Sequence, residues 1–445
     1  NKKINPSNLE DVIVTSIVKK AEEISDNVIT FENVNYNKRD RKVDKILTSK
    51  KYGFPIMLCL LMVVFWITII GANYPSSILY DFLFWIEDKL LELFRMIKAP
   101  IWLSNCLVLG VYRVLAWVIS VMLPPMAIFF PLFTLLEDLG YLPRIAFNLD
   151  RCFKKCKTCG KQALTMCMGF GCNAAGVTGA RIIDSPRERL IAILTNSFVP
   201  CNGRFPAIIS IITMFFVGFN VSLGNSLLTT VILTLVILMG IFMTFTISRL
   251  LSNTILKGMP SSFTLELPPY RKPQIGKVLI RSIFDRTLFV LGRAISVAAP
   301  AGLVIWILAN VNYNGLSLLE YCSNFLDPIG SLMGLDGVIL MAFILGFPAN
   351  EIVIPLIIMG YMAMGTITEF DNLVELKKLL ISNGWTTITA INFIIFSLFH
   401  FPCSTTCMTI RKETGSNKWM FVAIIIPTLV GFIFCVLINL FFKII

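Results

Sequence analysis

The sequence is poor in groups that carry catalysis or bind nucleotides. It contains one histidine, His400, among 445 residues, which excludes a metal centre built from several imidazoles. It has no G-x-x-x-x-G-K-[ST] segment, so the chain holds no P-loop to cradle a phosphate. Residues 37–40 match the N-K-x-D pattern of guanine recognition, but without a P-loop upstream the match carries no weight. No nucleophile motif is present either, and we predict that this chain is not an enzyme.

Charge is also scarce. Charged residues make up 15% of the sequence and hydrophobic residues 56%, too little polarity to cover a soluble domain of this size. We therefore predict an all-α polytopic membrane protein with seven to nine spans, depending on whether 162–178 and 337–360 cross fully or fold back. Apolar runs of about 20 residues, enough to cross the hydrocarbon core, lie near 54–73, 105–134, 190–217, 226–248, 287–309, 337–360, 387–402 and 419–442.

The positive charges indicate orientation. The net charge is +12, but Lys and Arg gather beside the apolar runs, so no nucleic-acid partner is expected. They are dense in 38–51, 144–161 and 249–286, whereas 310–336 has three acidic residues and no Lys or Arg. The positive-inside rule places the first three segments in the cytoplasm and the last outside. The N-terminal residues lack a signal-peptide pattern and are predicted to be cytosolic.

Short elements recur in the same order in two parts of the chain. An Ile-Ser-Val is followed about 50 residues later by Gly-Phe-x-x-Asn and then by Pro-Cys. The three elements start at 119, 169 and 200 in one unit and at 295, 346 and 402 in the other. Charge bias gives the two units opposite directions, so we predict inverted repeats with a substrate site at their interface near mid-membrane.

The repeats divide the chain into five parts. We predict a cytosolic tail with a basic linker (1–50), a first membrane helix with an extracytoplasmic amphipathic segment (51–100), a first repeat (101–250), a basic cytoplasmic linker (251–286) and a second repeat (287–445).

Glycine and proline interrupt the apolar runs at both Gly-Phe-x-x-Asn elements. Such breaks free backbone groups that only protein or cavity water can satisfy at membrane depth; packing glycines and ordinary kinks are the alternative. Glu351 points most strongly to function, because an intramembrane carboxylate is costly, although it could pair with Arg204 or Arg293 instead. His400 is the only histidine, and a single histidine is somewhat more often structural than a ligand. The candidate metal ligands beside the breaks are Cys172, Asn173, Cys201, Asn202, Asn350, Glu351, His400, Cys403 and Cys407.

The mixture of donors indicates the kind of ion. Thiols suit soft or borderline metals, and amide or carboxylate oxygens suit harder ones. Cys with Asn and Glu therefore fits a borderline ion such as Fe²⁺ better than Na⁺ or Ca²⁺. The competing hypothesis is a carrier for a polar organic solute such as a nucleoside. A separate group, Cys152, Cys156 and Cys159, has metal-type spacing without a fourth ligand nearby, and its role stays open.

Several longer motifs resemble the FeoB family of prokaryotic ferrous iron transporters. Residues 169–173, 181–189 and 196–206 resemble its first gate region, and 136–144 the segment before that gate. Residues 346–351, 401–403 and 411–416 resemble its second gate. The resemblance covers about residues 36 to 440.

The resemblance carries several implications. It implies Fe²⁺ as the substrate, the prokaryotic inner membrane as the location, and Cys172 and Cys403 as gate cysteines. In that family a GTPase domain and a helical spacer precede the membrane part, and residues 1–35 resemble the last spacer helix. GTP and Mg²⁺ are therefore expected only in a domain that this chain lacks, and no cofactor is expected here. The partners implied are membrane lipid, that GTPase domain, a small cytosolic Feo protein and further copies in a homo-oligomer.

Overall fold

The protein is almost entirely helical. The computed structural model describes residues 6–28, 38–49, 51–218, 223–258, 270, 274–276, 280, 282–313, 315–363, 365 and 373–444. Strand structure in this part is a two-residue hairpin, β1 (Asn312–Tyr313) with β2 (Leu316–Ser317). Six helical stretches here are long and apolar enough to cross a membrane, and the bent pair Leu318–Leu332 and Gly337–Leu345 makes a seventh. The predicted all-α polytopic fold is confirmed.

Counting the bent pair, the total of seven in the described residues is at the lower end of the predicted seven to nine. The apolar run at 287–309 forms one continuous helix, Phe289–Asn310, whereas the run at 337–360 breaks after residue 345. Interrupted helices of this kind are expected where the backbone lines a site.

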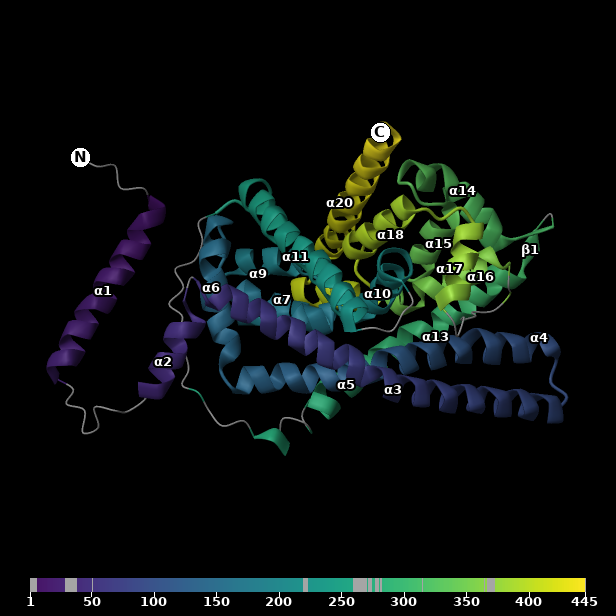
Figure 1. Ribbon diagram of the computed structural model, residues 1–445, viewed down its shortest axis with the longest axis horizontal. Coiled ribbons are helices and arrows are strands. Elements are labelled where there is room, and N and C mark those ends of the chain that lie inside the picture. The colour runs from purple at the N-terminus through teal and green to yellow at the C-terminus, as the bar shows by residue number, and fades with distance from the viewer. Residues whose placement is uncertain are drawn as a thin grey trace.

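A long helical hairpin forms one side of the molecule (Figure 1). One arm is α3 (Gly53–Met96); the other is α4 (Ile101–Ser104), η1 (Asn105–Tyr112) and α5 (Arg113–Asp138). At 1.5 Å per residue α3 is about 66 Å long, roughly twice the hydrocarbon thickness. The arms are joined by an ion pair in which Arg113 Nε donates to the buried Glu87 carboxylate at 3.0 Å.

The first repeat contains two breaks between helices. One is at Cys172, whose backbone is extended (φ −151°, ψ 126°), and the other spans residues 199–201. After α5 the elements are α6 (Tyr141–Lys155), α7 (Lys161–Gly171), α8 (Asn173–Gly179), η2 (Ala180–Ile182), α9 (Pro186–Thr195), η3 (Asn196–Phe198), η4 (Asn202–Arg204), α10 (Phe205–Ile212), η5 (Thr213–Val217) and α11 (Leu223–Asn253).

The second repeat has the same two breaks. Ala349, which precedes the repeated Asn as Cys172 does, has nearly the same backbone (φ −151°, ψ 117°), and the second break spans 400–403. The elements are η6 (Ser282–Leu288), α13 (Phe289–Asn310), α14 (Leu318–Leu332), α15 (Gly337–Leu345), η7 (Asn350–Ile352), α16 (Val353–Tyr361), α17 (Leu373–Ser382), α18 (Thr387–Phe399), α19 (Ser404–Thr414) and α20 (Asn417–Ile444).

The leading helices of the two repeats run in opposite directions. At one end Ser282 Oγ donates to Thr134 Oγ1 at 3.0 Å. At the other end a Cβ on Gly302 would lie 2.8 Å from the Gly110 carbonyl, and Gly110 packs on Trp306. Rising residue numbers in one helix thus meet falling numbers in the other, as inverted repeats require.

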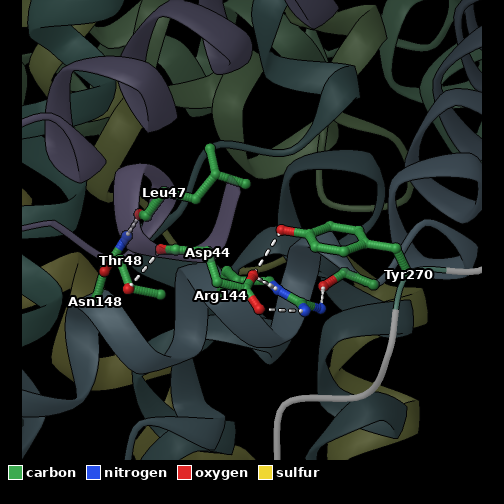
Figure 2. A network of polar contacts seen from close by, with 7 residues as sticks. Asp44, Leu47, Thr48, Arg144, Asn148 and Tyr270 are labelled. Carbon is green, nitrogen blue, oxygen red and sulfur yellow. Dashed lines mark hydrogen bonds and ion pairs between the residues drawn. The ribbon is translucent and has the colours of Figure 1, made fainter. Parts of the chain in front are cut away.

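A polar joint fastens the helix before α3 to the first repeat (Figure 2). The helices here are α2 (Lys38–Leu47) and α6, while α1 (Pro6–Val28) stands apart in Figure 1. The buried Arg144 donates from Nε to Asp44 Oδ1 at 2.9 Å and lies 4.1 Å from the centre of the Tyr270 ring. The Tyr270 hydroxyl donates to the same Asp44 oxygen at 2.7 Å. We call these three residues the Asp44 joint.

The Asp44 joint should weaken in acid. Burial alone would raise the pKa of Asp44, but hydrogen bonds from Arg144 and Tyr270 and the Arg144 charge hold it below its usual value. A depressed carboxyl pKa stabilises the docked helix above about pH 4, and that stability is lost as pH falls through the folded pKa. Asp44→Asn should remove it at neutral pH.

The measurement is hydrogen exchange of the α2 amides. Protection should fall by about tenfold in Asp44→Asn, since hydrogen bonds to charged groups contribute roughly 1.5–3 kcal/mol. Asp40→Asn on the same helix is the control and should exchange like the unmodified chain. Equal protection in both variants would contradict the role given to the joint.

Candidate functional site

The breaks of both repeats meet around one small cavity. Its volume is about 40 Å³, room for a few water molecules. Cys172, Cys201 and Cys403 each occupy the N-cap position of the segment that follows a break, so the starts of three helical segments lie beside this cavity. The lining residues are Met122, Met126, Gly171, Cys172, Asn173, Cys201, Asn202, Gly203, Pro348, Ala349, Asn350, Glu351, Cys403 and Thr405.

Seven of the nine predicted ligands lie on this wall, and two lie behind it. His400 is buried with Nδ1 2.9 Å from the Ser397 carbonyl, to which it donates, and Nε2 3.3 Å from Asn350 Oδ1. The Cys407 thiol donates to the Pro402 carbonyl at 3.4 Å. Both therefore sit where they can support wall residues and the second break, whereas the other seven face the cavity.

Asparagines satisfy the backbone at the first break. With its amide oriented to match its neighbours, the Asn173 nitrogen donates to the carbonyls of Gly169 and Val199, both at 3.2 Å. Asn196 Nδ2 donates to the Asn173 carbonyl at 3.0 Å. A Cβ on Gly169 or Gly176 would come within 2.9 Å of Asn196 Oδ1, so these two positions need glycine. Sequence reasoning missed Asn196, although a polar residue three positions before a break was an available signal.

Arg204 ties the second breaks of the two repeats together. Its buried guanidinium donates to the carbonyls of Ser197, Leu398, His400 and Phe401 at 3.1, 2.7, 3.2 and 3.2 Å. One of these partners belongs to the first repeat and three to the second. The suggested ion pair with Glu351 is thus replaced by backbone contacts, and the Arg293 side chain lies outside the described residues.

Glu351 faces the cavity against a glycine. Its carboxylate occupies the space where a Cβ on Gly203 would be, which brings the segment after the second break of one repeat against the first break of the other. Among the described residues it has no ion-pair partner, and no three His, Cys, Asp or Glu side chains come close enough to hold a metal ion together. In this part of the chain the donors surround a space without forming a closed cage.

Gly203→Ala should therefore destabilise the protein. The added methyl must displace the Glu351 carboxylate, and overpacking of this kind costs about 1–3 kcal/mol. The unfolding temperature in detergent should fall by about 1–3 °C, and Glu351→Asp in the same chain should restore part of it because the side chain is one methylene shorter. Gly292→Ala, where a Cβ meets open space, is the control. No rescue by the shorter carboxylate would contradict the contact.

Two family comparisons cover most of the repeats. Residues 119–215 and 291–417 match the Gate family, described as nucleoside recognition. Residues 233–285 match the family described as ferrous iron transport protein B C terminus. A protein of Staphylococcus aureus named Fe(2+) transporter FeoB is 31% identical over 425 residues. The chain belongs to the FeoB family.

Other FeoB relatives come from distant organisms. A Methanocaldococcus jannaschii protein of the same name is 27% identical over 89% of this chain and 58% of its own length. A Porphyromonas gingivalis protein, named as a fusion of Fe(2+) transport protein A with FeoB, is 25% identical over 86% of this chain and 49% of its own length. The Staphylococcus protein is matched over 93% of this chain, which spans 60% of its length. No solved structure matches the chain.

Proposed function

We propose that this FeoB chain forms a membrane path for Fe²⁺. The observation that carries the proposal is the convergence of thiols from both repeats with amide and carboxylate oxygens on one small cavity. This donor mixture suits a borderline divalent ion. The relatives named Fe(2+) transporter support the same substrate.

The donors around the cavity suggest how the ion passes. Fe²⁺ loses part of its water on entering the cavity and exchanges it for Cys172, Cys201 and Cys403 in turn. Glu351 offsets the positive charge, and Asn202 and Asn350 add neutral oxygens. Because the donors surround the space without caging it, each position holds the ion weakly, which is what release requires. His400 and Cys407 would act by holding Asn350 and the second break in place.

We expect Fe²⁺ to leave toward the cytoplasm beside an ion pair that joins the two repeats. Arg181 donates to both Glu413 oxygens at 2.8 and 2.7 Å, joining η2, the short helix after α8, to α19. By the positive-inside rule, the basic residues of 181–189 favour the cytoplasmic side for this pair. Release of the ion toward the cytoplasm requires these two helices to separate.

The proposal also covers the location, the control and the partners of the protein. We place the chain in the inner membrane with its N-terminus in the cytoplasm, under the control of a GTPase domain of the full protein. A small Feo partner is supported by the fused relative of Porphyromonas gingivalis. Homo-oligomers in lipid are expected as well.

A nucleoside carrier is the second candidate, because the Gate family is described by nucleoside recognition. The cavity argues against it. At about 40 Å³ it is far smaller than the roughly 300–1,000 Å³ of sites for organic ligands. Cysteine thiols also add nothing to the binding of a ribose or a base.

The test is uptake by the chain reconstituted in liposomes under reducing conditions. Fe²⁺, Mn²⁺, Zn²⁺ and a nucleoside are offered separately, with empty liposomes as the control. Saturable Fe²⁺ entry without nucleoside entry is expected. Nucleoside entry with no metal entry would replace the proposal with the second candidate.

A further inference from the structure

Two methionines on α5 complete the cavity wall. Met122 and Met126 are four residues apart, one helical turn, and therefore share a face of the helix. Both line the cavity; Met126 is fully buried and Met122 half-buried. They come from the helix that leads into the first repeat, whereas the other wall residues belong to the breaks and the turns beside them.

Their sulfur atoms change the chemistry of the wall. With Cys172, Cys201 and Cys403 they bring five sulfurs to one space of about 40 Å³. A thioether is neutral at every pH, so it binds a cation without losing a proton, whereas each thiol that binds as thiolate releases one. Thiolate and thioether ligands together favour Cu⁺ over harder ions.

The spacing of the donors also favours soft monovalent ions. No three His, Cys, Asp or Glu side chains among the described residues can share an ion, so a divalent ion that needs four or more ligands is held loosely. Soft monovalent ions such as Cu⁺ and Ag⁺ need only a few sulfur donors, and five sulfur-bearing side chains line this wall. We propose that Met122 and Met126, acting with the cavity thiols, capture Cu⁺ or Ag⁺ and that these ions block the path.

The alternative is that both methionines only fill space, as they do in many cores. Leucine distinguishes the two roles, since Met to Leu nearly conserves volume and usually costs less than about 1.5 kcal/mol while removing the sulfur. Met214→Leu is the matched control, because Met214 is as buried as Met126 but does not line the cavity.

The first readout rests on the proposed function. Liposomes are incubated with Ag⁺ in chloride-free buffer without thiols or other reductants, unbound Ag⁺ is removed, and Fe²⁺ uptake is then measured under anaerobic conditions, so that dissolved Ag⁺ and Fe²⁺ never meet. In Met122→Leu with Met126→Leu the Ag⁺ concentration for half block should rise about tenfold or more. Met214→Leu should match the unmodified chain. All chains compared keep the same twelve cysteines, so silver bound to thiols outside the cavity affects each of them equally.

The second readout does not depend on transport. Equilibrium dialysis counts the Ag⁺ ions bound per chain in detergent, and the double variant should bind one tight Ag⁺ fewer than the Met214→Leu chain. If the unmodified chain moves no Fe²⁺ but the double variant still binds one Ag⁺ fewer, the proposed function is wrong and the silver site is supported. Unchanged silver binding by the folded double variant would overturn it. If the double variant does not fold, Met122→Leu alone, at the half-buried position, gives the same comparison.

Discussion

Replacing Cys172 and Cys403 together with serine is expected to abolish Fe²⁺ uptake. The two thiols come from opposite repeats and line the same cavity, so the double change removes soft donors from both sides of the path. Serine keeps the size and leaves a neutral hydroxyl, a poor ligand for a borderline ion. The loss should exceed the about 10–100-fold that removal of an outer-shell partner costs a metal site. Initial rates of Fe²⁺ entry into liposomes provide the measurement.

The control is a cysteine-to-serine change at a buried position that does not line the cavity. Cys435 is fully buried, and its thiol donates to the Asn392 carbonyl at 3.4 Å, but it does not line the cavity. Cys435→Ser should move Fe²⁺ at close to the unmodified rate. A folded double variant that moves Fe²⁺ as fast as Cys435→Ser would show that the ion does not use the cysteine wall.

Removing the Arg204 guanidinium is expected to weaken the contact between the repeats and to lower the stability of the protein. Arg204→Met leaves four buried carbonyls without their donor, and breaking a buried charged contact of this kind costs about 3–5 kcal/mol. The unfolding temperature in detergent should fall by about 3–5 °C, and Fe²⁺ uptake should be lost with it. The unfolding temperature of Arg204→Lys should lie between those of the unmodified chain and Arg204→Met. The lysine ammonium keeps the charge, but it lacks the planar guanidinium group that reaches carbonyls of both repeats.

Arg189 provides the matched comparison. It bonds the Ile183 carbonyl through Nε at 3.0 Å, within one repeat. Arg189→Met should therefore lower the unfolding temperature by much less than Arg204→Met. If the two variants unfold at the same temperature, Arg204 does not hold the repeats together.

Local signals in the sequence were enough to find the breaks. Gly and Pro interrupt helices wherever they occur in an apolar run, and their recurrence before Asn173 and Asn350 marked both repeats. The cysteines that follow or precede those breaks were found for the same reason, and the structure brings seven of the nine predicted residues to one cavity. Their role as ligands stays a prediction.

The sequence by itself thus determined the helical membrane class, the repeats and the places where helices stop, because each depends on residues close together in the chain. Only the tertiary structure decided which side chains meet. Met122 and Met126 look like ordinary core residues in an apolar run, and Arg204 finds carbonyls nearly 200 positions away. Such partners depend on how two inverted units pack, and packing is set by surfaces that no short stretch of sequence contains.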